Sequence, residues 1–245
     1  MLKHAWAVLV AYAKIYNLKT GVRATDHLRR IDGGLPERFK HVQSILEHEA
    51  LTAKLVEFIC LVYGDDLWES GVDIDPVRAS FLASHHDDVE WRDGDMVPQL
   101  GYKDFTPERK AIAERNALED LIGSERNFLR KAYEEYEARR TPEAILAKVG
   151  DILELFCHNR VLLCFGMGTI TYENYRECAP ETHDESLEFL EQSATGETSV
   201  AEVLEARYIK RFRELNFPPV YQNIFDDITY ALKTFPFGEY IEADR

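Results

Sequence analysis

The sequence predicts an all-α protein. Apolar residues recur at intervals of three and four residues over long stretches, the spacing that gives a helix one apolar face. Three places carry an N-cap residue followed by proline, a pairing that typically opens a helix: Asp75-Pro76, Thr106-Pro107 and Thr141-Pro142. The alternation of apolar and polar residues that indicates a strand never persists, so we expect no β-sheet.

The helical pattern can be followed along the whole chain. Helices are expected at 3–18, 38–63, 76–90, 107–122, 142–166 and 201–233. The connecting stretches are polar or rich in glycine and proline, most clearly at 20–36, 91–105 and 174–200. No internal repeat and no change in composition divides the chain, which predicts one domain over residues 1–245.

The net charge of the chain limits which classes of molecule it is expected to bind. The chain has 245 residues, of which 45% are hydrophobic, so it can build a large core. Its formal net charge is −15, and no basic stripe is available to contact a phosphate backbone. A nucleic-acid polymer is therefore not expected as a partner. A small anionic substrate requires a local reversal of this negative field, which a divalent cation and a few arginines can supply.

No segment is typical of a secreted or membrane protein. The apolar stretch at 5–15 lacks a cleavage-type site and is interrupted by Lys14, and the later apolar run at 161–167 is too short to span a bilayer. The four cysteines form no CxxC pair: Cys60, Cys157, Cys164 and Cys178. We therefore expect a cytoplasmic protein with reduced thiols and no membrane partner.

Four polar residues interrupt the apolar stripes of three predicted helices: His48, His86, Asp87 and Asp151. His48 precedes Leu51 and Leu55 by three and seven residues, so it lies on their stripe. An unpaired ionised carboxylate is too costly to bury, which makes the two aspartates informative. Two nitrogen and two oxygen ligands around one divalent cation satisfy all four residues, and the cation is Mn, Co, Fe, Ni, Mg or Zn. The alternative is a set of separate buried salt bridges, for example with Arg115 or Lys148.

Glu90 is a candidate for the chemistry itself. It follows His86 by four residues, so in a continuous helix both side chains project from one face. A carboxylate beside the metal but outside the ligand set can orient or deprotonate an attacking water. The alternative is that Glu90 is the solvated end of a helix.

Four segments, in this order, resemble the HD-domain superfamily, whose pattern is H…HD…D on successive helices. They are Ser44–His48 (SILEH), Ala83–Glu90 (ASHHDDVE), Gly94-Asp95 with Pro98, and the run from Tyr133 to Leu155. The similarity is closer to one branch, the 5′-deoxynucleotidases, which remove phosphate from deoxynucleoside 5′-monophosphates. It covers roughly residues 27–165. The resemblance implies an HD-type helical bundle over about 27–165, with additional C-terminal helices over about 166–245.

The resemblance also implies roles for individual residues. The metal ligands are again His48, His86, Asp87 and Asp151. Glu90 activates water, and Asp95 contacts the nucleotide sugar or helps with proton transfer. Arg38 is the first candidate to contact the phosphate and Arg30 the second. The chain departs from this branch because it has no tryptophan in the Arg30 region and because Trp91 and Arg92 follow Glu90.

Other HD proteins remain as alternatives. Hydrolases of the alarmone guanosine tetraphosphate carry H-D-x-x-E-D, which His86–Glu90 matches until Trp91 replaces the final Asp. Dinuclear HD phosphodiesterases require histidines between the HD pair and the last Asp, and residues 88–150 contain none, which favours one metal. A nucleoside triphosphate hydrolase and a non-catalytic nucleotide-binding protein are the further alternatives. The expected partner is a small nucleotide substrate, and the sequence leaves a homodimer open.

Overall fold

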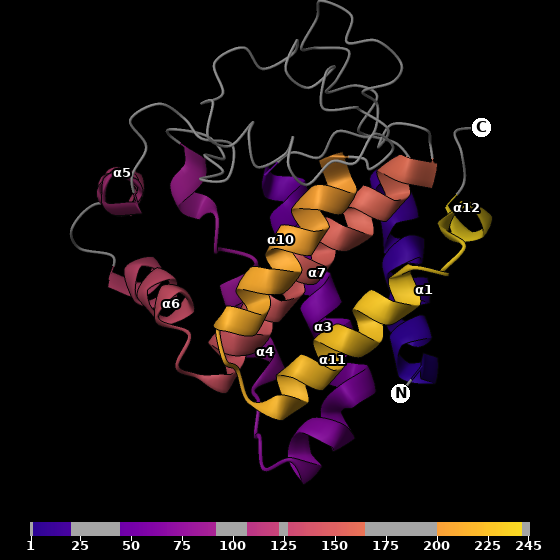
Figure 1. Cartoon of the computed structure of the whole chain (residues 1–245). Coiled ribbons are helices and arrows are strands. Elements are labelled where there is room, and N and C mark those ends of the chain that lie inside the picture. The colour runs from indigo at the N-terminus through magenta and orange to yellow at the C-terminus, as the bar shows by residue number, and fades with distance from the viewer. Residues whose placement is uncertain (1, 21–44, 92–106, 123–126, 165–199, 242–245) are drawn as a thin grey trace, which may run out of the picture.

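The computed structural model describes residues 2–20, 45–91, 107–122, 127–164 and 200–241. Within these ranges the chain is helical and contains no strand, which confirms the all-α prediction (Figure 1). The helices are α1 (Leu2–Thr20), α3 (Ile45–Glu69), α4 (Pro76–Ala83), the 3₁₀ helix η2 (Asp88–Trp91), α5 (Pro107–Ile122), α6 (Asn127–Ala138), α7 (Pro142–Cys164), α10 (Val200–Glu214), α11 (Pro219–Leu232) and α12 (Phe237–Tyr240).

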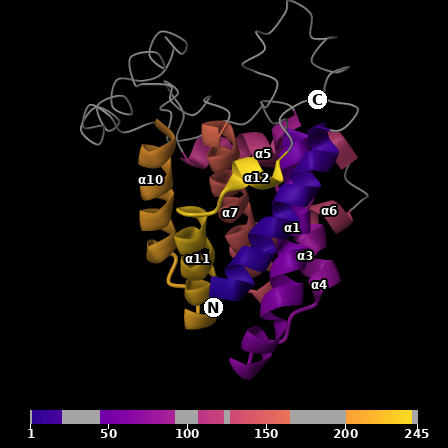
Figure 2. The same cartoon turned by 90° about the vertical axis from the view of Figure 1, so that its right-hand side faces the viewer.

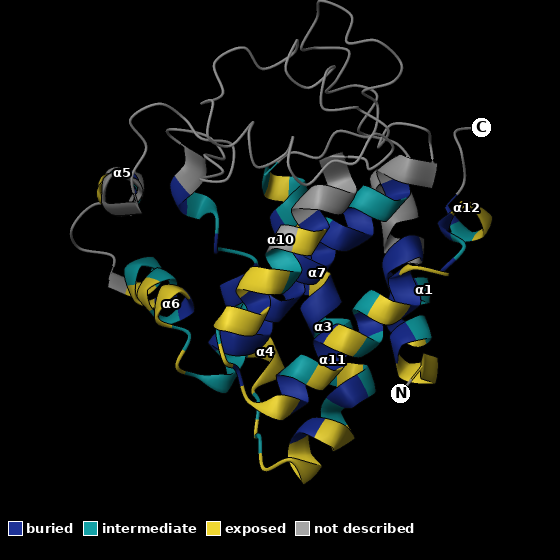
Figure 3. Cartoon of the chain, in the orientation of Figure 1, coloured by how far each residue is buried: buried dark blue, intermediate teal, exposed yellow. Residues whose placement is uncertain are grey.

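Helix α7 is the centre of the bundle. It packs against α3, α4, α6, α10, α11 and α12, and α1 closes the other side by packing on α3 and α11 (Figures 1 and 2). Buried residues lie on the inward faces of these helices, and exposed residues lie on the outer faces (Figure 3). None of the helices in the described ranges combines the length and the apolar character that crossing a membrane requires.

Two of the predicted helix starts are visible with their caps. Asp75 Oδ1 accepts hydrogen bonds from the backbone N–H groups of Val77 and Arg78 at 2.9 and 3.1 Å. Thr141 Oγ1 accepts one from Ala144 N at 3.2 Å. In both cases the side chain satisfies a backbone donor that the first helical turn leaves unpaired. Helix α5 also begins at the predicted proline, although Thr106 itself lies outside the described residues.

Helix α3 extends six residues beyond the expected end at 63, to Glu69. Leu67 is 3% exposed, so its burial continues the apolar face past Gly64. Two residues after the end of the helix, Gly71 has a φ of +76°, in the left-handed region that favours glycine. Val72 N–H donates to Leu67 O at 3.0 Å there, which closes the final turn.

The expected end of α4 near residue 90 is wrong, because the helix stops at Ala83. The polar residues that follow bind the last turn with their side chains. Ser84 Oγ donates to Phe81 O at 3.0 Å, and His86 Nδ1 lies 2.8 Å from Ala83 O, the geometry of an N–H donor to that carbonyl. Side chains that bond nearby backbone groups compete with the helix and end it. His86 and Asp87 therefore lie in the turn after α4.

The C-terminal pattern at 201–233 forms two helices, α10 and α11, where one was expected. Pro218 and Pro219 separate them, since proline has no N–H to donate to a helix and clashes with the preceding turn. Asn216, with φ of +50°, reverses the chain before the prolines. Helix α6 also falls where no helix was predicted.

Gly150 allows α7 to approach α3 closely. A Cβ at this position would lie 2.4 Å from Val56 Cγ2, closer than real Cβ contacts. Val56 is β-branched, so its side chain has little rotational freedom within a helix. We expect Gly150→Ala to lower the free energy of unfolding by up to about 2 kcal/mol. Overpacking costs about 1–3 kcal/mol, and the helix propensity of alanine offsets about 1 kcal/mol of this. Urea denaturation measures the change.

Gly64 is the matched control, because it lies within α3 and a Cβ there would meet nothing within 4 Å. Gly64→Ala should therefore stabilise the protein by up to about 1 kcal/mol. In a Val56→Ala background the loss caused by Gly150→Ala should be smaller than in the wild-type background, since the clashing atom is gone. Equal stabilisation by both glycine substitutions would contradict the close approach.

Candidate metal centre

Three helices bring the predicted ligands together. His48 lies in the first turn of α3, His86 and Asp87 lie in the turn after α4, and Asp151 lies within α7. These helices all pack on one another. Residues that are as far as 103 positions apart in sequence are therefore neighbours in space.

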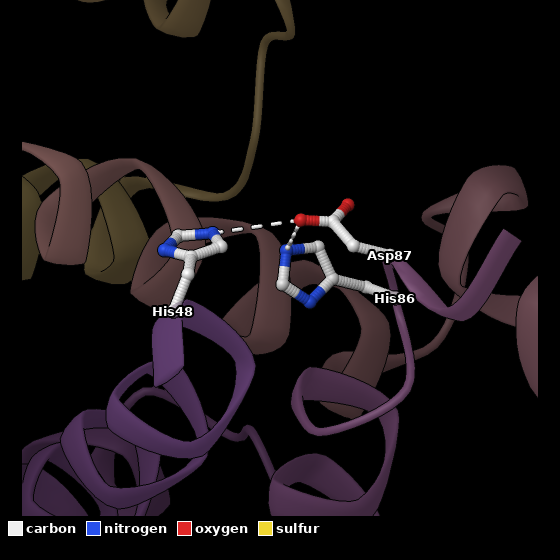
Figure 4. Close-up of side chains that lie close together, drawn as sticks. All are labelled: His48, His86 and Asp87. Carbon is white, nitrogen blue, oxygen red and sulfur yellow. Dashed lines mark ion pairs between the residues drawn. The ribbon is translucent and has the colours of Figure 1, made fainter. Parts of the chain in front are cut away.

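His48, His86 and Asp87 form a compact group (Figure 4). Asp87 Oδ2 lies 3.1 Å from His86 Nε2 and 3.7 Å from His48 Nε2. One potential ligand atom of each residue lies within 4.8 Å of the other two. Atoms that share a cation at about 2.1 Å are separated by no more than about 4.2 Å, and both distances to Asp87 satisfy that limit. These three side chains could hold a metal ion.

Asp151 lies beside this group. Its Oδ1 is 3.2 Å from His48 Nε2 and 3.5 Å from His86 Nε2. Its Oδ2 accepts hydrogen bonds from Lys148 Nζ at 2.6 Å and from Tyr136 OH at 2.9 Å. The alternative of a salt bridge with Lys148 therefore applies to one carboxylate oxygen, while the other faces the histidines. Arg115, the other partner considered, is exposed on α5.

Both imidazole rings have the orientation expected of metal ligands. His48 Nδ1 lies 2.5 Å from Glu154 Oε2, and His86 Nδ1 lies 2.8 Å from Ala83 O. With each Nδ1 occupied, each Nε2 is left facing Asp87 and Asp151. His86 Nε2 is buried and, within the described part of the chain, has no hydrogen-bond partner despite the nearby carboxylates. A buried nitrogen in this condition fits a cation, since metal-bound histidines commonly bond a carboxylate or carbonyl through the other nitrogen.

The positive and negative side chains of the group shift one another's pKa values toward the charged forms. Burial acts to lower the pKa of His86, but the carboxylates of Asp87 and Asp151 outweigh it and raise the pKa to about 10. Burial acts to raise the pKa of Asp87, but His86 outweighs it and the pKa is lowered. The pKa of Asp151 is lowered as well, because Lys148 and His86 outweigh the effect of burial. A divalent cation would take the place of the protons, since these residues bind metal in their deprotonated forms.

The group is closed on its inner side and accessible from outside. The side chains of His86 and Glu154 are 2% and 0% exposed. Those of His48, Asp87 and Asp151 are 18%, 24% and 17% exposed. These three residues therefore keep part of their side-chain surface exposed, whereas His86 and Glu154 are enclosed by the core.

Two buried acids of this region were not predicted. Glu154 contacts His48, and Glu49 Oε1 accepts a hydrogen bond from Asp87 N at 3.2 Å. Burial and the charge of Asp88 raise the pKa of Glu49 to about 7. A search for single acidic residues within apolar runs would have found Glu154, because Ile152, Leu153, Leu155 and Phe156 surround it.

The structure does not describe the side chains of the remaining predicted site residues. Arg30, Arg38 and Asp95 lie outside the described residues. The backbone of Glu90 belongs to η2, and its side chain is not described. The helical spacing that placed Glu90 on the face of His86 is wrong, because no continuous helix joins them. Its suggested role in activating water stays a prediction.

The model of a known protein family, the HD domain, matches residues 37–175. This match spans more than half of the chain, and the chain therefore belongs to the HD-domain family. Membership supports a metal-dependent phosphohydrolase, with His48, His86 and Asp87 able to hold the metal. No curated protein and no solved structure is significantly similar to the chain.

Proposed function

We propose that this protein is a metal-dependent phosphohydrolase that removes phosphate from nucleoside 5′-monophosphates and prefers deoxynucleotides. One observation supports a metal-dependent reaction most strongly. The Nε2 atoms of His48 and His86 both lie within 3.7 Å of the same oxygen of Asp87, in a chain of the HD-domain family. The choice of a nucleotide monophosphate depends on the resemblance of four segments to the 5′-deoxynucleotidases.

The protein supplies the metal ligands and the residues that hydrogen-bond to them. One divalent ion, Mn, Co, Fe, Ni, Mg or Zn, would be held by His48, His86 and Asp87, with Asp151 as a fourth ligand through Oδ1. Lys148 and Tyr136 hold Asp151 by its other oxygen. The cation would supply Lewis-acid polarisation of the phosphoryl group and offset the negative field of the chain.

The remaining roles belong to residues around the ligands. Glu90 orients or deprotonates the attacking water. Asp95 contacts the sugar or helps with proton transfer, and Arg38 and Arg30 contact the phosphate. Arginine is well suited to that task because its planar guanidinium donates two parallel hydrogen bonds to phosphate oxygens.

Inorganic phosphate release from a panel of nucleotides tests the substrate. We expect release from deoxynucleoside 5′-monophosphates in the presence of Mn²⁺ or Co²⁺, slower release from ribonucleotides, and none with EDTA. A deoxynucleoside 3′-monophosphate is the matched control, since it has the same charge and base but a phosphate at the wrong position. A colorimetric phosphate assay measures all of these rates.

Other products would identify a different HD reaction. Release of pyrophosphate from guanosine tetraphosphate would favour the alarmone hydrolases, and release of triphosphate would favour a nucleoside triphosphate hydrolase. A chain that binds nucleotides but hydrolyses none of them with any of the six metals would be a non-catalytic nucleotide-binding protein.

A further inference from the structure

Glu154 is a fully buried carboxylate in the middle of α7. Its side chain is 0% exposed and lies among apolar core residues. A buried carboxylate is costly unless ionised partners or hydrogen bonds compensate for lost water. Oε2 lies 2.5 Å from His48 Nδ1, and Oε1 accepts a hydrogen bond from Tyr12 OH at 2.7 Å. Each oxygen of the carboxylate therefore has a partner on a different helix.

The two nitrogens of His48 face different surroundings. Nδ1 points to Glu154 in the core, while Nε2 points to Asp87 and Asp151. A carboxylate on Nδ1 keeps the proton on that nitrogen, which leaves the Nε2 lone pair for a cation. It also makes the imidazole a more basic ligand.

Tyr12 extends this arrangement to the N-terminal helix. It is 1% exposed on α1, and its hydroxyl bonds a residue 142 positions later in the sequence. Helix α1 lies outside residues 37–175, the part that matches the HD domain. A helix beyond the family match is thus two hydrogen bonds from a candidate metal ligand.

We propose that Tyr12 and Glu154 are positioning residues of the metal centre. Tyr12 fixes the carboxylate of Glu154, Glu154 fixes the ring of His48, and α1 is thereby part of the metal site. This depends on the proposed function only in requiring that His48 binds a metal. A purely structural role for the same contacts predicts lower stability without a change in metal affinity.

Calorimetric titration with Co²⁺ tests the proposal on the 245-residue chain. Glu154→Gln keeps the size of the side chain but removes its charge, and we expect about 10- to 100-fold weaker Co²⁺ binding, the typical loss for an outer partner of a metal ligand. Tyr12→Phe should weaken binding in the same direction by less. The double variant should bind no more weakly than Glu154→Gln alone, because Tyr12 acts through Glu154.

Tyr221→Phe is the matched control. Tyr221 is also 1% exposed, and its hydroxyl donates to Pro142 O at 3.2 Å, away from the candidate ligands. Its loss should lower the melting temperature and leave Co²⁺ affinity unchanged. If Glu154→Gln does not fold, the Co²⁺ affinities of Tyr12→Phe and Tyr221→Phe are compared, and weaker binding in Tyr12→Phe alone supports the positioning role.

The outcomes separate the two proposals. Wild-type protein that binds Co²⁺, with unchanged affinity in folded Tyr12→Phe and Glu154→Gln, would overturn the positioning role and leave the proposed function intact. Wild-type protein that binds no divalent ion would overturn both.

Discussion

Asp87→Asn is expected to abolish metal binding and, with it, phosphohydrolase activity. Both histidines approach Asp87 Oδ2, and the amide oxygen of asparagine lacks the charge that holds a divalent cation. The loss of metal affinity should exceed the roughly 10- to 100-fold loss that is typical when a partner outside the ligand set is substituted. Wild-type protein should bind one ion per chain. Added Co²⁺ should stabilise it by about 2.7 kcal/mol at 100 times the dissociation constant, and the variant should gain nothing.

Asp88→Asn is the matched control for this variant. It removes the same charge at the adjacent residue, whose carboxylate lies 2.7 Å from His85 Nδ1 outside the candidate ligand group. Metal analysis by mass spectrometry and thermal unfolding with and without Co²⁺ measure both variants. Two ions per wild-type chain, or equal loss of binding in both variants, would contradict the single site.

Glu90→Gln is expected to lower kcat by about 10²- to 10⁴-fold, the usual contribution of a general base. Glutamine keeps the size and the hydrogen-bonding shape of the side chain but cannot take a proton from water. Its effect should fall on the transition state, so metal content and nucleotide affinity should stay near the wild-type values. Steady-state kinetics together with metal analysis separate these quantities.

Asp95→Asn provides the contrast. If Asp95 contacts the sugar, its substitution should weaken nucleotide binding at least as much as turnover. Full turnover by Glu90→Gln would show that another group activates the water.

The sequence predicted the parts of the fold that local chemistry decides. Asp75 and Thr141 open their helices as their proline neighbours indicated, because capping involves residues only two or three positions apart. His48 and Asp151 lie near each other as their places on apolar stripes suggested. Spacing puts each of the two residues on an inward helix face, since a helix face is a local property. The packing of α3 against α7 then brings the two faces together.

Spacing was insufficient where side chains bond to the backbone or to distant residues. The end of α4 depends on the ring of His86 bonding Ala83 O, which no periodicity records. Glu154 depends on partners 106 and 142 positions away, which only the packed bundle brings together. Long-range pairs of this kind require the tertiary structure.

The single imidazole of His86 ties the last turn of α4 to the ligand group. Its Nδ1 bonds Ala83 O, and its Nε2 faces Asp87. The end of the helix and the placement of the ring are therefore coupled through one side chain. A substitution of His86 would remove a helix terminator together with a candidate ligand, and its phenotype would combine the two.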